Sequence, residues 1–157
     1  MFGKNWVGIQ RFEPVPLELS DLIEVFEIDQ LCFKPELAFP KSFVRFLLSS
    51  PDCLGLGIKD KGKLAGFVII QAENLDRVRL ITLDLRPEYR GKGMGNALLK
   101  YLHQFLKEKG FSRIVLEVAV DNQPAINLYQ KLGYEQKKIV KRYYPDGTDG
   151  ILMEKKF

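Results

Sequence analysis

The chain has 157 residues, which is enough for one domain with a full hydrophobic core and too few for two comfortable ones. Its net charge is +4, charged residues make up 28% of the chain, and no basic run marks it as a nucleic-acid-binding protein. We therefore expect a single domain over residues 1–157 and no nucleic-acid partner.

The two cysteines and the single histidine show no metal-binding pattern. Cys32 and Cys53 lack the spacing of metal ligands, and His103 falls in the polar stripe of a predicted helix, where we expect it to be exposed. The start of the chain lacks the apolar stretch of a signal peptide, and no segment is long enough to span a membrane. These features predict a cytoplasmic protein with reduced thiols and with no metal or membrane partner. A monomer and a homodimer are both compatible with the sequence.

The first third of the chain predicts a strand and two helices. The strand covers Ile9–Val15, and the first helix begins after Ser20 or Asp21. A second helix covers Lys41–Leu48. The side chains expected to face inward are Leu22, Ile23, Phe26 and Leu31 in the first helix and Phe43, Phe46 and Leu47 in the second.

The segment Phe33–Pro40 between these helices is predicted to be a stiff, partly apolar loop. It contains two prolines and two phenylalanines, Phe33 and Phe39. Two interpretations are open: the loop covers the hydrophobic core, or it forms one wall of a substrate pocket.

The middle of the chain predicts three strands and a long helix. Leu54–Ile58 and Leu64–Gln71 form a hairpin, and Val78–Leu85 is the next strand. A helix then runs from the turn Arg90–Gly95 to a stop at Gly110. Its apolar face is predicted to contain Met94, Ala97, Leu98, Tyr101, Leu102, Phe105 and Leu106.

The turn Arg90–Gly95, with the sequence RGKGMG, has few bulky side chains to shield its backbone. Several N–H groups at the start of the helix can therefore converge on an anion, and Arg90 and Lys92 favour the same ligand. The spacing fits neither a Rossmann fingerprint nor a P-loop. The turn is therefore either a phosphate cradle of another kind or a simple reversal of the chain.

The last third predicts a strand over Ile114–Val120, a short helix between Pro124 and Gly133, and a hairpin formed by Tyr134–Val140 and Ile151–Lys155. The long helix before them must cross over between two parallel strands. The fold class predicted is α/β (α+β), with a mixed, mostly antiparallel central sheet, one parallel pair and helices on both faces.

Two carboxylates interrupt apolar strands and are candidates for a general base. An ionised Glu117 would be costly to bury without a partner, which suits this side chain to accept a proton. The alternative is that it reaches the end of the sheet or pairs with a cation such as Arg113. Asp84 is the rival base, or one member of a polar face.

Tyr129 and Asn122 have simple structural interpretations. On spacing alone Tyr129 is a core residue or a catalytic one, and Asn122 is a turn residue or a helix cap. No Cys–His or Ser–His–Asp arrangement supports covalent catalysis.

Two stretches resemble a known family. Arg90, Gly93 and Gly95 match the pattern Arg/Gln-x-x-Gly-x-Gly/Ala, which strongly resembles the acetyl-CoA pyrophosphate loop of the GNAT superfamily of N-acetyltransferases. Leu116–Tyr134 resembles the second GNAT signature, in the branch that contains the ribosomal-protein alanine N-acetyltransferases, and the tail Arg142–Met153 resembles the same branch.

This resemblance implies a GNAT-type fold and direct transfer of an acetyl group from acetyl-CoA to an amine in a ternary complex. It implies that Glu117 is the base, that Tyr129 is the acid and that Asn122 binds the pantetheine arm. The cofactor-binding residues expected are Leu83, Leu85, Arg90, Gly91, Lys92, Gly93, Met94, Gly95, Asn96, Asn122 and Tyr129. The substrate-binding residues expected are Phe33, Phe39, Asp84, Tyr143 and Tyr144.

The sequence departs from this branch near the expected acceptor pocket. Ala119 stands where the branch usually has arginine, and Asp84 stands where it usually has a small residue. We expect the acceptor to be the α-amine of a protein N-terminus. A small-molecule amine and a protein lysine are the alternatives, and a CoA-binding module without catalytic activity is the alternative from another functional class.

Overall fold

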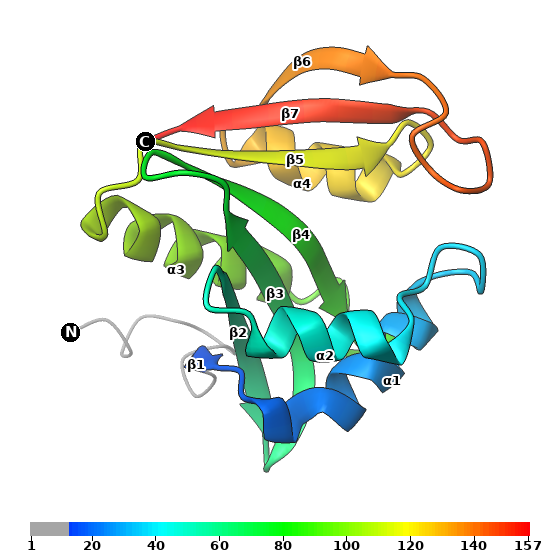
Figure 1. Cartoon of the computed structure of the whole chain (residues 1–157), viewed down its shortest axis with the longest axis vertical. Helices are drawn as coiled ribbons and strands as arrows, with labels where there is room; N and C mark the ends of the chain where they lie inside the picture. Colours follow the sequence, from blue (N-terminus) through cyan, green and yellow to red (C-terminus); the bar gives the residue numbers. More distant parts are fainter. Residues whose placement is uncertain (1–12) are drawn as a thin grey trace.

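The computed structural model describes residues 13–157, which form one mixed sheet with helices on both faces (Figure 1). The strand order is β1-β2-β3-β4-β5-β7-β6, and every neighbouring pair is antiparallel except β4 and β5. The strands are β1 (Val15–Pro16), β2 (Cys53–Asp60), β3 (Lys63–Ala72), β4 (Arg77–Leu85), β5 (Arg113–Ala119), β6 (Glu135–Val140) and β7 (Gly150–Lys156). This sheet confirms the predicted fold class. The strand predicted over Ile9–Val15 lies outside the described residues except at its end.

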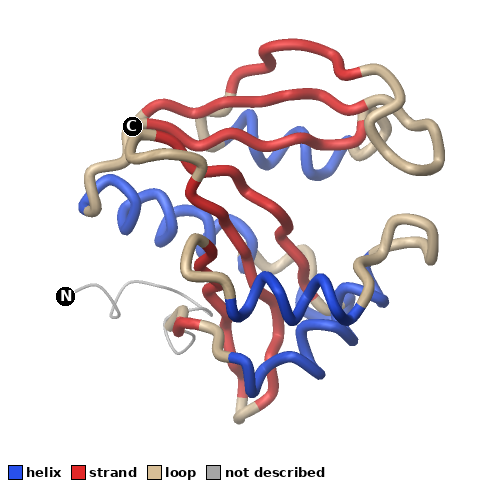
Figure 2. The backbone as a smooth tube through the Cα atoms, in the orientation of Figure 1, coloured by secondary structure: helices blue, strands red, loops and turns tan. Residues whose placement is uncertain are grey.

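The helices divide between the two faces of the sheet (Figure 2). α1 and α2 cover one face, and α3 and α4 cover the other. Their bounds are α1 (Leu22–Cys32), α2 (Lys41–Ser49), α3 (Met94–Glu108) and α4 (Gln123–Lys131), with short 3-10 helices at Leu19–Asp21 and Pro87–Tyr89. None of the helices in this part of the chain has both the length and the apolar character needed to cross a bilayer.

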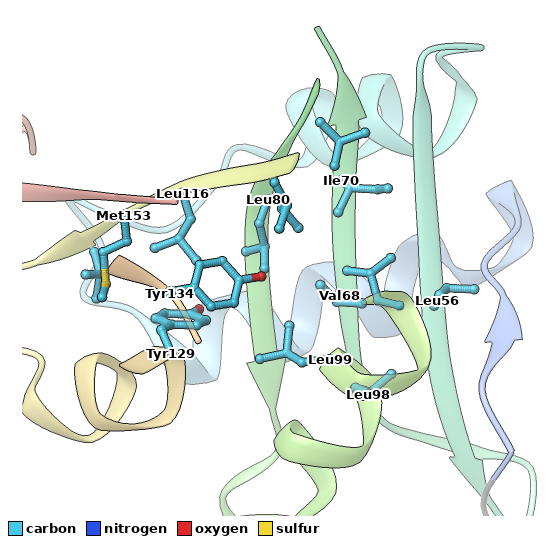
Figure 3. Packing of buried hydrophobic residues seen from close by; sticks show 14 of the residues in the cluster. Leu56, Val68, Ile70, Leu80, Leu98, Leu99, Leu116, Tyr129, Tyr134 and Met153 are labelled. Atoms are coloured by element: carbon cyan, nitrogen blue, oxygen red, sulfur yellow. The ribbon is translucent and has the colours of Figure 1, made fainter. Parts of the chain in front are cut away.

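The hydrophobic core consists of two clusters, because β3 is covered by helices on both of its faces. A strand in that position is apolar on successive residues rather than on alternate ones. Val68 and Ile70 belong to the larger cluster, with Leu98 and Leu99 of α3 (Figure 3). The smaller cluster contains Leu22, Val25, Ile28, Val44, Leu47, Leu64, Phe67 and Ile69.

The two central strands separate as they approach the glycine turn (Figure 1). β4 and β5 pair only at one end, where Arg77 pairs with Arg113, Val78 with Ile114, and Arg79 with Val115. Beyond that point β4 continues along β3, and β5 continues along β7. The parallel pair predicted on either side of the long helix is thus confirmed, and it opens toward the start of that helix.

The inward face of α1 differs from the prediction. Leu22, Val25 and Ile28 are buried, whereas Ile23 and Leu31 are 51% and 56% exposed. The sequence of α1 carries more apolar residues than its contact with the sheet can cover. Periodicity therefore predicted the helix correctly but not its rotation about its own axis.

The same error affects two other helices. In α2, Val44 and Leu47 are buried, while Phe43 and Phe46 lie on the exposed side, where their rings stack with centroids 6.1 Å apart. In α3, Tyr101 is 42% exposed instead of facing the core.

The prediction that His103 is exposed is wrong. Only 9% of His103 is exposed, and its Nε2 lies 2.8 Å from the hydroxyl oxygen of Tyr134. Burial, with a smaller effect from Lys155, lowers the pKa of His103 to about 4. The polar stripe of α3 is covered at this position by Tyr134 and Phe157, which are distant in sequence.

Candidate active site

The glycine turn before α3 exposes backbone N–H groups. Gly91 and Gly93 have φ angles of 73° and 79°, in the left-handed region that glycine adopts most easily. Gly93 is the N-cap of α3 and supplies no side-chain acceptor, so the N–H groups of the first helical turn remain available. A Cβ added at Gly91 would meet no atom within 4 Å. These residues fit the pyrophosphate of a CoA molecule, which a helix N-terminus can bind without a dedicated side chain.

The two cations of this turn have different positions. The Nε of Arg90 donates to the Leu85 carbonyl oxygen at 3.1 Å, and its Nη2 lies 3.2 Å from the Cys32 Sγ. Arg90 therefore joins the end of β4 to the end of α1. Lys92 is exposed, and its Nζ lies 5.9 Å from the centroid of the Tyr89 ring.

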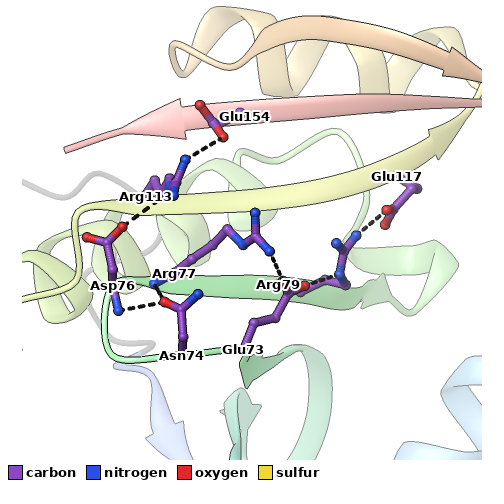
Figure 4. A network of polar contacts seen from close by, with 8 residues as sticks. All are labelled: Glu73, Asn74, Asp76, Arg77, Arg79, Arg113, Glu117 and Glu154. Carbon is purple, nitrogen blue, oxygen red and sulfur yellow. Dashed lines mark hydrogen bonds and ion pairs between the residues drawn. The ribbon is translucent and has the colours of Figure 1, made fainter.

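Glu117 lies on β5, where that strand has separated from β4, and it is paired with Arg79 of β4 (Figure 4). Arg79 also binds Glu73, so one guanidinium bridges two carboxylates. The sequence suggested Arg113 as the partner of Glu117, but the Nε of Arg113 instead lies 3.3 Å from the Oδ2 of Asp76. The carboxylate of Glu117 is therefore held in one orientation at the mouth of the opening.

Asp84 belongs to a second, fully buried carboxyl pair. It is 1% exposed, as is Asp29 of α1, and the two carboxyl groups lie close enough for Asp29 to raise the pKa of Asp84. One oxygen of each carboxyl group, Asp29 Oδ1 and Asp84 Oδ2, has no hydrogen-bond partner among the described residues. A buried charge without a partner is costly, so the protonated form of the carboxyl group is favoured. Burial, with the nearby Asp29, raises the pKa of Asp84 to about 8. The Thr82 hydroxyl donates to the remaining oxygen of Asp84.

This carboxyl pair also positions the loop Phe33–Pro40. The second oxygen of Asp29 accepts the backbone N–H of Phe39 at 2.6 Å. The ring of Phe39 packs edge-on against Phe43, with centroids 4.9 Å apart. The loop is therefore fixed to α1.

Tyr129 lies on the inner face of α4. It is 6% exposed, and its ring centroid lies 5.4 Å from that of Tyr134 (Figure 3). Burial is the main cause of the raised pKa of its hydroxyl, so the oxygen keeps its proton at neutral pH. The ring is thus part of the core, and the hydroxyl is protonated.

Asn122 is the N-cap of α4, as the structural interpretation of the sequence predicted. Its side-chain oxygen accepts the backbone N–H of Ala125 at 3.3 Å. The side-chain NH2 group is not used by this cap and can donate to a ligand.

The two predicted substrate walls face each other across the open end of the sheet (Figure 1). Tyr143 and Tyr144, in the turn between β6 and β7, form an edge-on pair with centroids 4.9 Å apart. Burial, and then the charge of Glu117, raise the pKa of Tyr143, so this ring lies close to the candidate base. On the opposite side, Phe33 is 36% exposed.

Sequence reasoning missed Arg79 and Asp29. Each pairs with a predicted site residue that is far away in the chain. For Arg79 the sequence offered only a local signal. Arg79 alternates with the apolar residues of β4, which places its side chain on the same face of the strand as Ile81, before the bulge.

Comparison with known proteins agrees with this geometry. The model of the "Acetyltransferase (GNAT) family" matches residues 22–134. The chain is 36% identical over 135 residues to the ribosomal protein bS18-alanine N-acetyltransferase of Escherichia coli K12, a match that covers 85% of this chain and 87% of that protein. It is 31% identical over 147 residues to the N-alpha-acetyltransferase of Sulfurisphaera tokodaii, a match that covers 86% of this chain and 87% of that protein.

The crystal structure of the ribosomal-protein-S18-alanine N-acetyltransferase from Escherichia coli superimposes with a TM-score of 0.85, at 30% identity, over 92% of this chain and 93% of that one. A family match over most of the chain thus coincides with a matching fold. The chain belongs to the GNAT family of acetyltransferases, with acetyl-CoA as its acyl donor.

Proposed function

We propose that this enzyme acetylates the α-amine of a protein N-terminus, and that it does so in the cytoplasm. The names of two relatives, a ribosomal protein bS18-alanine N-acetyltransferase and an N-alpha-acetyltransferase, support this class of acceptor. Both cysteines are free thiols, which is consistent with a reducing compartment.

The observation that carries the proposal is the chemistry of the acceptor side. Tyrosine hydroxyls at an entrance can bind a peptide backbone without reading its side chains. A polyamine would instead require several free carboxylates. Asp146 accepts the Thr148 N–H at 3.0 Å, and Asp149 accepts the Arg142 N–H at 2.9 Å, so both serve the fold of their own turn.

Each candidate residue has one role in this proposal. Acetyl-CoA supplies the acetyl thioester, with its pyrophosphate at the glycine turn and its pantetheine arm between β4 and β5. Glu117, held by Arg79, removes the proton from the incoming amine. Backbone N–H groups at the end of β4 stabilise the negative charge that develops on the carbonyl oxygen. Tyr129 delivers a proton to the departing sulfur.

The test is acetyl-CoA consumption with a panel of acceptors, followed by mass spectrometry of the product. We expect peptides that begin with a free alanine or serine to be acetylated at the α-amine. The panel also contains the same peptides with a blocked N-terminus and an internal lysine, polyamines and amino sugars. Acetyl groups found only on lysine side chains or on a polyamine would overturn the proposed acceptor.

A paired variant tests the role of the tyrosines. Replacing Tyr143 and Tyr144 with phenylalanine keeps both rings and removes only their hydroxyls. We expect a higher KM for the peptide and unchanged acetyl-CoA binding. An unchanged KM would remove these hydroxyls from acceptor recognition.

A further inference from the structure

A pocket of about 560 Å³ lies at the C-terminal end of α3, away from the glycine turn. It is formed by α3, by the end of α4 and by the end of β7. Five lysines line it, and no acidic side chain does: Lys100, Lys107, Lys131, Lys155 and Lys156. We call these five residues the lysine pocket.

The lysines of the lysine pocket are not neutralised by acidic side chains of the described residues. Within residues 13–157, none of the five lysines forms an ion pair. Five positive charges in one depression exceed the net charge of the whole chain, which is +4. Like charges gathered in a concave surface repel one another and concentrate anions from solution.

We propose that the lysine pocket binds the phosphate backbone of a nucleic-acid strand. Lysine offers a compact, strongly hydrated point charge, which suits phosphate contacts that do not read sequence. Protein–protein interfaces are depleted in lysine and enriched in arginine and aromatic residues. The lining has no arginine and only one aromatic side chain other than His103, which is Phe157. An acidic protein segment is therefore the less favoured occupant.

The lysine pocket is separate from the acetyl-CoA turn. Lys107 lies thirteen residues beyond Met94, which corresponds to about 20 Å along the helix. Lys156 lies at the end of β7 and pairs with Arg113, at the end of β5 that still lies beside β4 and not at the end where the two strands part. Binding at these two lysines therefore does not depend on the proposed transfer reaction or on its acceptor.

The proposal predicts a salt-dependent affinity for nucleic acid. Binding of fluorescein-labelled RNA of about 20 nucleotides, and of DNA with the same sequence, is measured by anisotropy between about 50 and about 200 mM salt. Each phosphate that a lysine neutralises on a single strand releases counterions and adds about 0.7 to the steepness of log K against log salt. Lys107→Gln with Lys156→Gln removes two such cations, so the slope should become shallower by about 1.4.

The matched control is Lys61→Gln with Lys138→Gln, which removes the same charge from exposed positions outside the pocket. This control should keep the slope of the wild type, and both double variants should keep acetyl transfer to peptide. Stronger binding of RNA than of DNA would assign the site to RNA, and equal binding would assign it to either backbone.

Several outcomes would overturn the proposal. These are no binding by the wild type at low salt, equally weakened binding in both double variants, or displacement of the RNA by saturating CoA, which would place the strand on the glycine turn. Binding of a polyglutamate peptide in preference to RNA would assign the pocket to an acidic protein instead.

Discussion

The ion pair with Arg79 fixes the position of the Glu117 side chain before any substrate binds. A carboxylate on a largely apolar strand needs a partner, and the guanidinium of Arg79 on the neighbouring strand provides it. The buried pair of Asp29 and Asp84 solves the same problem differently, by keeping a proton. The site thus contains one carboxylate paired with a cation and one buried carboxyl group with a raised pKa.

Glu117→Gln tests this assignment. Glutamine keeps an oxygen for Arg79 but cannot accept the proton of the amine. We expect turnover near neutral pH to fall by about 10²–10⁴-fold, with a smaller loss at high pH, because an α-amine with a pKa of about 8 then loses its proton unaided. If instead Asp84→Asn causes this rate profile and Glu117→Gln does not, Asp84 is the base.

Tyr129→Phe separates the core role of this ring from its chemical role. The substitution keeps the packing against Tyr134 and removes only the hydroxyl. Turnover should fall by about 10²-fold or more, the scale expected for a lost general acid, with little change in CoA affinity. Near-normal turnover would leave Tyr129 as a core residue only.

Asp84→Asn should stabilise the protein more at high pH than at low pH. The folded protein holds the proton of Asp84 up to a pKa of about 8, while the unfolded chain releases it near pH 4. The wild type therefore loses stability as the pH rises through this window, and asparagine, which does not titrate, avoids that loss. Urea unfolding at about pH 5 and about pH 8 measures the difference. Equal effects at both pH values would contradict the raised pKa of Asp84.

At the scale of secondary structure, the start of α3 is the element on which the cofactor site depends. Its first N–H groups have neither helical nor side-chain acceptors, because Gly93 leaves the N-cap position without a side chain. The strand before it, β4, ends at Leu85, and the carbonyl oxygen of Leu85 accepts a hydrogen bond from the Nε of Arg90. This hydrogen bond connects the glycine turn to the end of β4.

Gly91→Asp and Gly91→Asn form a matched pair that tests the turn. Both residues tolerate the left-handed conformation better than other side chains do, and there is open space for them at this position. Only aspartate adds a negative charge beside the bound pyrophosphate. We expect Gly91→Asp to weaken acetyl-CoA binding by about tenfold or more, which is about 1.4 kcal/mol, and Gly91→Asn to weaken it far less. Equal affinities in calorimetry would argue against an anion at this turn.

At the scale of the whole molecule, the sheet consists of two parts that meet at only three residue pairs between β4 and β5. A ligand that lies between the parted strands contacts both of them. It binds the folded state and has no equivalent site in the unfolded chain.

Saturating CoA should therefore raise the melting temperature. At about 100 times its Kd, a ligand stabilises the folded state by about 2.7 kcal/mol, which corresponds to about 5–10 °C for a chain of this size. Differential scanning calorimetry measures the shift. Gly91→Asp should show a smaller shift at the same CoA concentration, and a wild type without any shift would contradict the cofactor site.

The sequence alone determined the features that depend on local pattern. The long helix, the strands around it, the crossover and the glycine turn all follow from periodicity and turn residues, and the structure confirms these elements. The parallel pair also follows, because a crossover helix joins two strands of the same sheet, whereas only the structure shows that these two strands part.

Only the tertiary structure decided which distant side chains meet. Arg79 reaches Glu117 across 38 positions of sequence, and Asp29 of α1 lies near Asp84 of β4. The five lysines of the pocket come from three separate segments, so no basic run reveals them. Such pairings depend on the rotation of each helix and the face of each strand. The rotation of a helix and the buried face of a strand are determined by the burial free energy summed over the whole core, because local sequence preferences are too weak to determine them.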